Sequence, residues 1–284
     1  MLLSQVRRGD GGIQIVAREG TEAYELATQS SLYDLAMECA ASDQGLKARV
    51  LDLGLRCAVD VGALCGEGRM LPPLVHPDPA HLLITGTSGT RHDWFEPGTG
   101  DVLIGPGAPV AWPGEFGDAA GIAGVYVIGP EGAPYRVGFV LANAFSDHPP
   151  HRQDNVRWDH ARLHQASFGP ELLVGPLPGA IGGRSRLRRD DETVAEVQFE
   201  PGMQSMSLSI ATLERDLFGF YARRRPGDVR IHIFGTVSLP VAEGFALVHG
   251  DVFETEAAPF GLPLWNPLSA PAGALTAPHS IHVL

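Results

Sequence analysis

The highest density of polar side chains lies between residues 143 and 164, in the sequence NAFSDHPPHRQDNVRWDHARLH. Asp147 and His148 follow an apolar run there, and Arg152 and Gln153 come shortly after them. A carboxylate, an imidazole, a guanidinium and an amide in a loop after a strand can bind a small anionic substrate and transfer a proton to it. Solvated loops often carry the same residue types, so this pattern alone is a weak signal of a site.

Two histidines in the same stretch have the spacing of a metal-binding pair. His160 and His164 are four residues apart, and on a helix that spacing puts both imidazoles on one face. The glutamate and the third ligand that complete a zinc protease motif are absent from the sequence. We therefore expect two exposed histidines here rather than a metal site.

A second polar cluster, GTSGTRHD, occupies residues 86–93 and follows a predicted strand at residues 81–85. The backbone amides of Gly86 and Thr87, together with the side chains of Arg91 and His92, can cradle a carboxylate or a phosphate. The sequence contains no Walker A motif, no GxGxxG between a strand and a helix, and no GxSxG elbow. Dinucleotide binding and α/β-hydrolase chemistry are therefore unsupported.

Composition narrows the class of protein. The chain has 284 residues, 44% of them hydrophobic and 19% charged, which allows a sizeable core in one large domain or two small ones. A formal net charge of −12 argues against nucleic-acid or anionic-membrane surfaces, which need clusters of Lys and Arg. No stretch approaches the apolar length of a membrane span, and three cysteines without CxxC spacing disfavour a disulfide framework. We expect a cytoplasmic protein that binds a small molecule, with no nucleic-acid or membrane partner.

The chain contains 35 glycines and 23 prolines, which favour turns, and this content predicts many short strands. Apolar spacing predicts one helix that begins near Ser31 and a second over residues 205–223. Strands are predicted at residues 81–85, 123–128, 135–142, 229–234 and 245–248. In the fourth of these, Arg230 and His232 share one face. Residues 1–72 are predicted to form a small N-terminal domain, and residues 73–284 one β-rich domain.

Several long blocks of the sequence resemble the fumarylacetoacetate hydrolase superfamily, and most closely its bacterial sugar-acid (arabonate-type) branch. They are IAGVYVIGPEGAPYRVGFVLANAFSDH at 122–148, SFGPELLVGPLP at 167–178, RRPGDVRIHIFGT at 224–236 and FGLPLWNPL at 260–268. The resemblance covers most of the chain in the same order. It implies an α+β, strand-rich fold: a mixed, largely antiparallel β-roll with outer helices, preceded by a small N-terminal domain and usually assembled as a homodimer.

The resemblance also implies a metal site. Members bind one Mg²⁺ or Mn²⁺ through three carboxylates: an acid-x-acid pair that opens the strand IAGVYVIG, and a third acid just after the asparagine of the next strand. In this sequence those positions are Ala119, Gly121 and Ala144, whose side chains offer no oxygen ligand. A lysine near the metal corresponds to Arg162, and a histidine of the 86–92 loop corresponds to Arg91, with His92 adjacent.

Three functional hypotheses follow. The first is a metal-independent enzyme that isomerises, dehydrates or cyclises a small keto or enol compound. Its acid, base and oxyanion-binding groups are Asp147, His148, Arg91 and His92, and its substrate-binding groups are Arg152, Gln153, Arg162, Thr236, Gly86 and Thr87. The second is a Mg²⁺- or Mn²⁺-dependent lyase or hydrolase of a keto-sugar acid, with ligands displaced to Asp118, Asp147 or Glu115. The third is a non-catalytic binding or partner protein with the same fold.

Overall fold

The structure is a computed structural model that describes residues 1–86, 98–111, 117–146, 163–178, 181–199, 209–219, 224–237, 239 and 246–269. Its helices are α1 (Leu32–Ser42), α2 (Leu46–Leu53), α3 (Val61–Gly66) and α4 (Ile210–Phe218). The first eight strands are β1 (Leu2–Arg7), β2 (Ile13–Glu19), β3 (Glu22–Leu26), β4 (Leu55–Ala58), β5 (Met70–Leu71), β6 (Leu82–Gly86), β7 (Gly98–Thr99) and β8 (Leu103–Ile104). The remaining strands are β9 (Gly117–Ile128), β10 (Pro134–Ser146), β11 (Leu163–Leu173), β12 (Gly183–Arg189), β13 (Glu192–Phe199), β14 (Val229–Val237), β15 (Val252–Ala257) and β16 (Leu264–Pro267).

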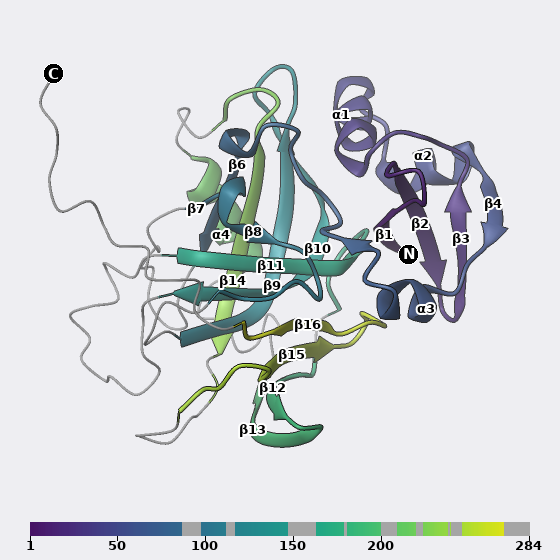
Figure 1. Ribbon diagram of the computed structural model, residues 1–284. Helices are drawn as coiled ribbons and strands as arrows, with labels where there is room; N and C mark the ends of the chain where they lie inside the picture. Colours follow the sequence, from purple (N-terminus) through teal and green to yellow (C-terminus); the bar gives the residue numbers. More distant parts are fainter. Residues whose placement is uncertain are drawn as a thin grey trace, which may run out of the picture.

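Two sheets organise the described part of the chain (Figure 1). The large mixed sheet has the order β4-β3-β2-β1-β11-β10-β9-β14-β6-β7, with β5 beside β1 and β8 beside β11. The smaller sheet has the order β13-β12-β15-β16. The predicted α+β, strand-rich class with a mixed sheet is confirmed.

The N-terminal strands and helices form a lobe beside the long strands (Figure 1). The strands of this lobe and the long strands belong to the same large sheet. Strand β1 connects the lobe to the long strands. It pairs with β2 on one side, and on the other side it pairs with β11 through Leu2↔Leu173 and Leu3↔Leu172. The boundary at residue 72 between two domains stays a prediction.

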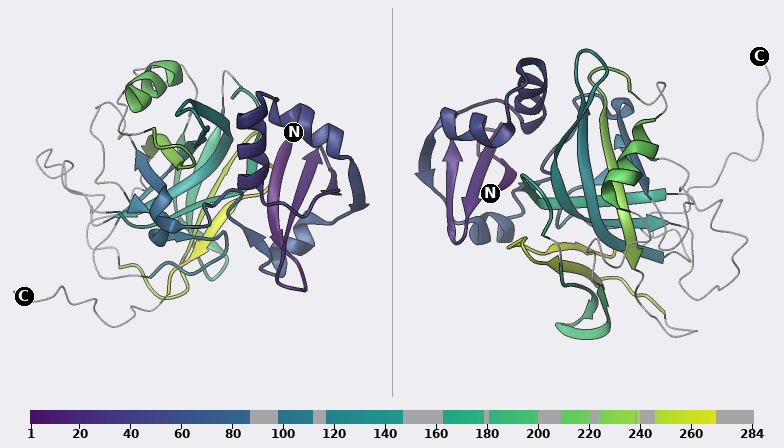
Figure 2. Two further views of the ribbon diagram at one scale, coloured as in Figure 1. Left: turned by 90° about the horizontal axis from the view of Figure 1, so that it is seen from above. Right: turned by 180° about the vertical axis from the view of Figure 1, so that it is seen from behind.

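The central strands β9 and β10 are covered on both faces, which explains why they are apolar along their length. One face packs against α1 in a cluster that includes Leu35, Val125 and Val140. The other face packs against α4 in a cluster that includes Tyr126 and Leu213. Figure 2 shows α4 lying on the long strands on the side away from the N-terminal lobe.

Local sequence signals predicted the first helix well. Ser31 is the N-cap of α1: its Oγ accepts a hydrogen bond from the backbone N–H of Asp34, and the Asp34 carboxylate accepts from the Ser31 N–H. This reciprocal pair is a capping box. The predicted second helix is present as α4, and the ends predicted at 205 and 223 lie outside the described residues.

Two strand predictions need correction. The strand predicted at 123–128 begins at Gly117, because β10 and β14 pair with β9 along its small-residue first half as well. The strand predicted at 245–248 is wrong for residues 246–248, which are irregular. Val248 N–H instead donates to the Asp251 carboxylate at 2.9 Å, so this apolar run belongs to a turn.

The arginine-rich run at 184–189 is balanced by acids of the neighbouring strand. In β12, Arg186 contacts Glu254 and Glu256, and Arg189 holds the buried carboxylate of Asp251 at 2.7 and 2.8 Å. This cross-strand pairing gives the run a role in joining β12 to β15. No helix in the described ranges is long and apolar enough to cross a membrane.

Candidate functional site

Five strand ends meet at one edge of the large sheet. Gly117, the first residue of β9, lies opposite Ser146, the last residue of β10, and Ser146 also lies opposite Leu163, the first residue of β11. The C-terminal ends of β14 and β6 reach the same edge, because β14 runs antiparallel to β9 and parallel to β6. We call this edge, where β9 and β11 begin and β6, β10 and β14 end, the loop edge (Figure 1).

The segments that carry most predicted site residues attach to the loop edge. Residue 87 follows β6, residue 147 follows β10, and residue 162 precedes β11. Eight predicted site residues in these segments lie outside the described residues: Thr87, Arg91, His92, Asp147, His148, Arg152, Gln153 and Arg162. Glu115 and His160 also lie outside them, so the displaced ligand Glu115 stays a prediction. His164 is described and lies half-buried in strand β11, so the helical spacing considered for His160 and His164 and the expected exposure of His164 are wrong.

The positions expected to hold metal ligands come together on one face of the sheet near the loop edge. Ala119 of β9 lies opposite Ala144 of β10, and Gly121 lies opposite Ala142. Ala119, Ala142 and Ala144 belong to the same buried cluster, on the face that packs against α1. The strand register therefore places the three positions as neighbours, two residues apart along β9 and directly across from β10.

The row of small residues extends into β11, which the sequence interpretation missed. Ala166 lies opposite Ala144, and Leu103 of β8 lies opposite Ala166. Ala119 is 8% exposed and Ala144 is 2% exposed, so methyl groups fill this face. The signal that could have found Ala166 is its cross-strand register, which only the fold supplies.

The donor set at these positions does not fit a divalent metal. Mg²⁺ and Mn²⁺ prefer oxygen ligands such as carboxylates, and Ala119, Gly121 and Ala144 have none on their side chains. Within the described ranges, no group of three or more His, Cys, Asp or Glu side chains is placed to hold a metal ion.

The side chain of Asn143 joins β10 to β9 beside Ala119. Its side chain is 2% exposed, and its Oδ1 accepts a hydrogen bond from the backbone N–H of Ala119 at 3.1 Å. The amide therefore bridges β10 and β9 beside the row of small residues. We interpret Asn143 as a positioning residue that fixes the strand register at the loop edge.

Asp118 lies on the opposite face of β9. It is paired with Phe145, which belongs to a separate apolar cluster, and its Oδ1 accepts from the Leu239 N–H at 3.1 Å. Burial raises the pKa of the Asp118 carboxyl to about 7, and the hydrogen bond from Leu239 lowers it by less. Asp118 is thus separated from Ala119 and Gly121 by the sheet itself, which disfavours it as a displaced metal ligand.

Two predicted site residues lie in described strands at the loop edge. Gly86 ends β6 and lies opposite Ile233. Thr236 of β14 lies opposite Gly121 of β9, so the register brings its backbone beside the expected metal position. The structure thus brings Thr236 and Gly121 together.

The contact between a buried histidine of β14 and a threonine of β6 was not predicted from the sequence. His232 of β14 is fully buried, and its Nδ1 lies 2.8 Å from the Thr85 Oγ1 of β6. Its ring packs edge-on against Phe234, with ring centroids 5.0 Å apart. The predicted face shared by Arg230 and His232 is confirmed, since they lie opposite Tyr126 and Gly124 of β9.

No family model and no curated protein matches the sequence. Solved structures do match its fold. A 2-keto-3-deoxy-D-arabinonate dehydratase, in a complex with magnesium and 2,5-dioxopentanoate, is 16% identical with a TM-score of 0.70, and the match covers 95% of this chain and 99% of that one.

Two further structures show the same architecture. The fumarylacetoacetate hydrolase of Exiguobacterium antarcticum is 15% identical with a TM-score of 0.63, over 95% of this chain and 99% of that one. The 2-hydroxyhepta-2,4-diene-1,7-dioate isomerase of Mycobacterium marinum is 14% identical with a TM-score of 0.60, over 95% and 98% of the two chains. The chain therefore has the fumarylacetoacetate hydrolase fold over nearly its whole length, as the resemblance of its sequence blocks implied.

Proposed function

We propose that this protein is an enzyme of the fumarylacetoacetate hydrolase type that acts on a small keto or enol acid without a bound divalent metal. The observation that carries the proposal is the row of Ala119, Gly121 and Ala144 on one face of the sheet at the loop edge. That face lies where the segments with the predicted acid, base and anion-binding residues attach. The solved relatives include a dehydratase, an isomerase and a hydrolase, which makes proton transfer next to a carbonyl a suitable reaction class.

In the proposed mechanism, positioned side chains supply what a metal would otherwise supply. Asp147 or His148 removes a proton from the carbon next to the substrate carbonyl, and the electron pair moves onto the carbonyl oxygen. Arg91, His92 and the backbone amides of residues 86–87 stabilise that oxyanion through charge-assisted hydrogen bonds. Return of the proton to a different carbon completes an isomerisation, and loss of a neighbouring hydroxyl as water completes a dehydration.

The remaining polar residues would hold the substrate. Arg152, Gln153 and Arg162 are suited to bind a substrate carboxylate, and a threonine such as Thr236 is suited to donate a hydrogen bond to the substrate. Cyclisation of a bound intermediate needs the same positioning and proton transfer. From the sequence resemblance we further propose a cytoplasmic homodimer.

The test measures enolisation directly, so the true product does not have to be known. The protein is dialysed against EDTA and incubated in D₂O with 2-oxobutanoate or 2-oxopentanedioate, and loss of the proton signal next to the carbonyl is followed by NMR. We expect exchange that is faster than in buffer and unchanged by added EDTA or Mg²⁺. His148→Ala should slow it by about a hundredfold, as expected for loss of a general acid or base.

A matched control is His249→Ala, because His249 is exposed in a turn and is not among the predicted site residues. It should leave the exchange rate unchanged. Exchange that EDTA abolishes and Mg²⁺ restores would contradict metal independence and support displaced ligands. Exchange at the rate of buffer alone would contradict the enzymatic proposal and favour a non-catalytic protein.

A further inference from the structure

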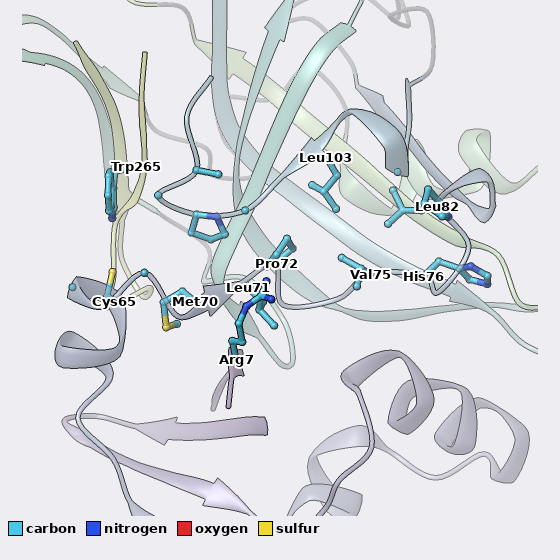
Figure 3. Close-up of a pocket in the computed structure, with 18 residues that line it drawn as sticks. Arg7, Cys65, Met70, Leu71, Pro72, Val75, His76, Leu82, Leu103 and Trp265 are labelled. Atoms are coloured by element: carbon cyan, nitrogen blue, oxygen red, sulfur yellow. The ribbon is translucent and has the colours of Figure 1, made fainter. Parts of the chain in front are cut away.

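A cavity lies between the N-terminal lobe and the rest of the molecule. Its volume is about 480 Å³, within the range of small-molecule sites. It is lined from β1, α3, β5, the segments at 72–82 and 100–108, and β16 (Figure 3). Ala119, Gly121, Ala144 and Thr236 are not among its lining residues. We call it the lobe pocket.

Apolar groups form most of the wall of the lobe pocket. Leu71, Val75 and Leu82 line it, and Trp265 stands at one end in Figure 3, while His76 lies at the other. An elongated apolar wall closed by an indole ring suits an apolar or aromatic molecule, because burial of its surface removes it from water.

The Trp265 end of the lobe pocket is held firmly in place. Asn266 donates from Nδ2 to the carbonyls of Gly105 and Ala108, at 3.0 and 2.8 Å, and Trp265 O accepts from the Gly107 N–H at 2.7 Å. Gly107 has a φ of 78°, and a side chain there would come within 2.9 Å of the Trp265 ring. The indole therefore lies directly against the loop backbone in a fixed position, which lowers the entropic cost of binding.

Among the described residues that line the lobe pocket, one side chain is permanently charged: the exposed guanidinium of Arg7. Arg7 is the only Arg, Lys, Asp or Glu among the lining residues. Its main chain is fixed, since its N–H donates to Arg69 O and its carbonyl accepts from Arg69 Nε. Glu67 is paired with Arg69 at 3.2 Å rather than with Arg7. Figure 3 shows Arg7 reaching from β1 toward Leu71, in the middle part of the lobe pocket.

We propose that the lobe pocket binds a small apolar or aromatic monocarboxylate. The ligand carboxylate pairs with the planar guanidinium of Arg7, which presents two parallel donors to two oxygens. The apolar body lies along the wall between Leu71 and Trp265. One cation and apolar walls match a single negative charge, whereas a phosphate would bring a second charge with no partner. This proposal is independent of the reaction proposed at the loop edge.

The experiment uses 3-phenylpropionate as the probe and its neutral amide, 3-phenylpropionamide, as the matched ligand. Binding to the full chain is followed by ¹H–¹⁵N NMR at the Trp265 indole N–H, which is assigned with Trp265→Phe. We expect the acid to bind at least about tenfold more tightly than the amide, the contribution of one charged hydrogen-bonding pair. Because the readout is binding at Trp265, it does not depend on any activity at the loop edge.

Variants of Arg7 separate charge from packing. Arg7→Met should reduce the affinity for the acid to that for the amide. The affinity for the amide should stay unchanged, and this would show that the lobe pocket is intact in the variant. Arg7→Lys should restore part of the preference for the acid. The control Arg56→Met removes an exposed strand arginine of β4 that does not line the lobe pocket, and it should change neither affinity. Equal affinities for acid and amide, an unchanged acid affinity in Arg7→Met, or no indole shift up to about 10 mM acid would each overturn the proposal.

Discussion

Replacing the buried Asp118 by Asn should stabilise the protein at neutral pH and remove part of its pH dependence. The Asp118 carboxyl is fully buried, and burial raises its pKa from 3.8 to about 7. A rise of about three units corresponds to about 4 kcal/mol between the charged and neutral forms in the folded state. The folded protein therefore binds a proton at Asp118 that the unfolded chain releases between pH 4 and pH 7.

The sign of the effect follows from that proton. Below pH 4 the carboxyl is neutral in both states, so Asp118 costs no ionisation energy. As the pH rises toward 7, the unfolded state is favoured increasingly, and above pH 7 the loss levels off at about 4 kcal/mol. Asp118→Asn keeps an oxygen that accepts the Leu239 N–H but cannot ionise. Its free energy of unfolding should exceed that of the wild type by up to about 4 kcal/mol at pH 8, and the difference should shrink toward pH 4.

The assay is urea unfolding followed by circular dichroism at several pH values from 4 to 8, with the slope against urea checked for constancy. Asp216→Asn, which changes an exposed aspartate of α4, is the matched control and should show no pH-dependent difference. A difference between Asp118→Asn and wild type that does not vary with pH, or a variant less stable at pH 8, would refute this account of Asp118.

Two further predictions concern the N-terminal lobe and its contacts. Ser31→Ala removes the side-chain acceptor of the α1 capping box and should lower the free energy of unfolding by about 1 kcal/mol in urea titration, whereas Ser31→Asp should retain most of it. Glu171→Ala should lower it by about 3–5 kcal/mol, because it leaves the guanidinium of Arg18 without its buried partner and the N–H groups of Gly261 and Leu262 without an acceptor. Thermal unfolding of Glu171→Gln should show a smaller loss, because the amide oxygen still accepts a hydrogen bond, and a loss equal to that of Glu171→Ala would contradict any contribution from neutral hydrogen bonding there.

Elements set by neighbouring residues were predictable from the sequence, and those set by distant partners were not. The start of α1 near Ser31 was predicted because the apolar spacing of the helix is a local signal, and the capping box of Ser31 and Asp34 is local as well. The predicted strand started only at residue 123, because Ala and Gly have little strand propensity and the first half of β9 is held extended by its pairing with β10 and β14.

The contacts around the candidate site were not predictable from the sequence. The resemblance placed Ala119, Gly121 and Ala144 at corresponding positions, and the register shows that they are neighbours. The pairing of His232 with Thr85 joins residues 147 positions apart in the chain, so no local pattern could reveal it. The lobe pocket likewise depends on residues as distant as Arg7 and Trp265, which only the folded sheet brings to one cavity.

The place of β1 in the large sheet has a consequence for biosynthesis. β1 pairs with β2 soon after both are made, and Gln5 and Val6 pair with β5, but the part of β1 at Leu2 and Leu3 waits for β11, about 170 residues further along the chain. At ordinary translation rates this takes roughly ten to thirty seconds, during which an apolar strand edge is unpaired. Such an edge is a template for pairing with another chain. Ribosome-bound chains that end before β11 should therefore depend on chaperones more than the complete protein does.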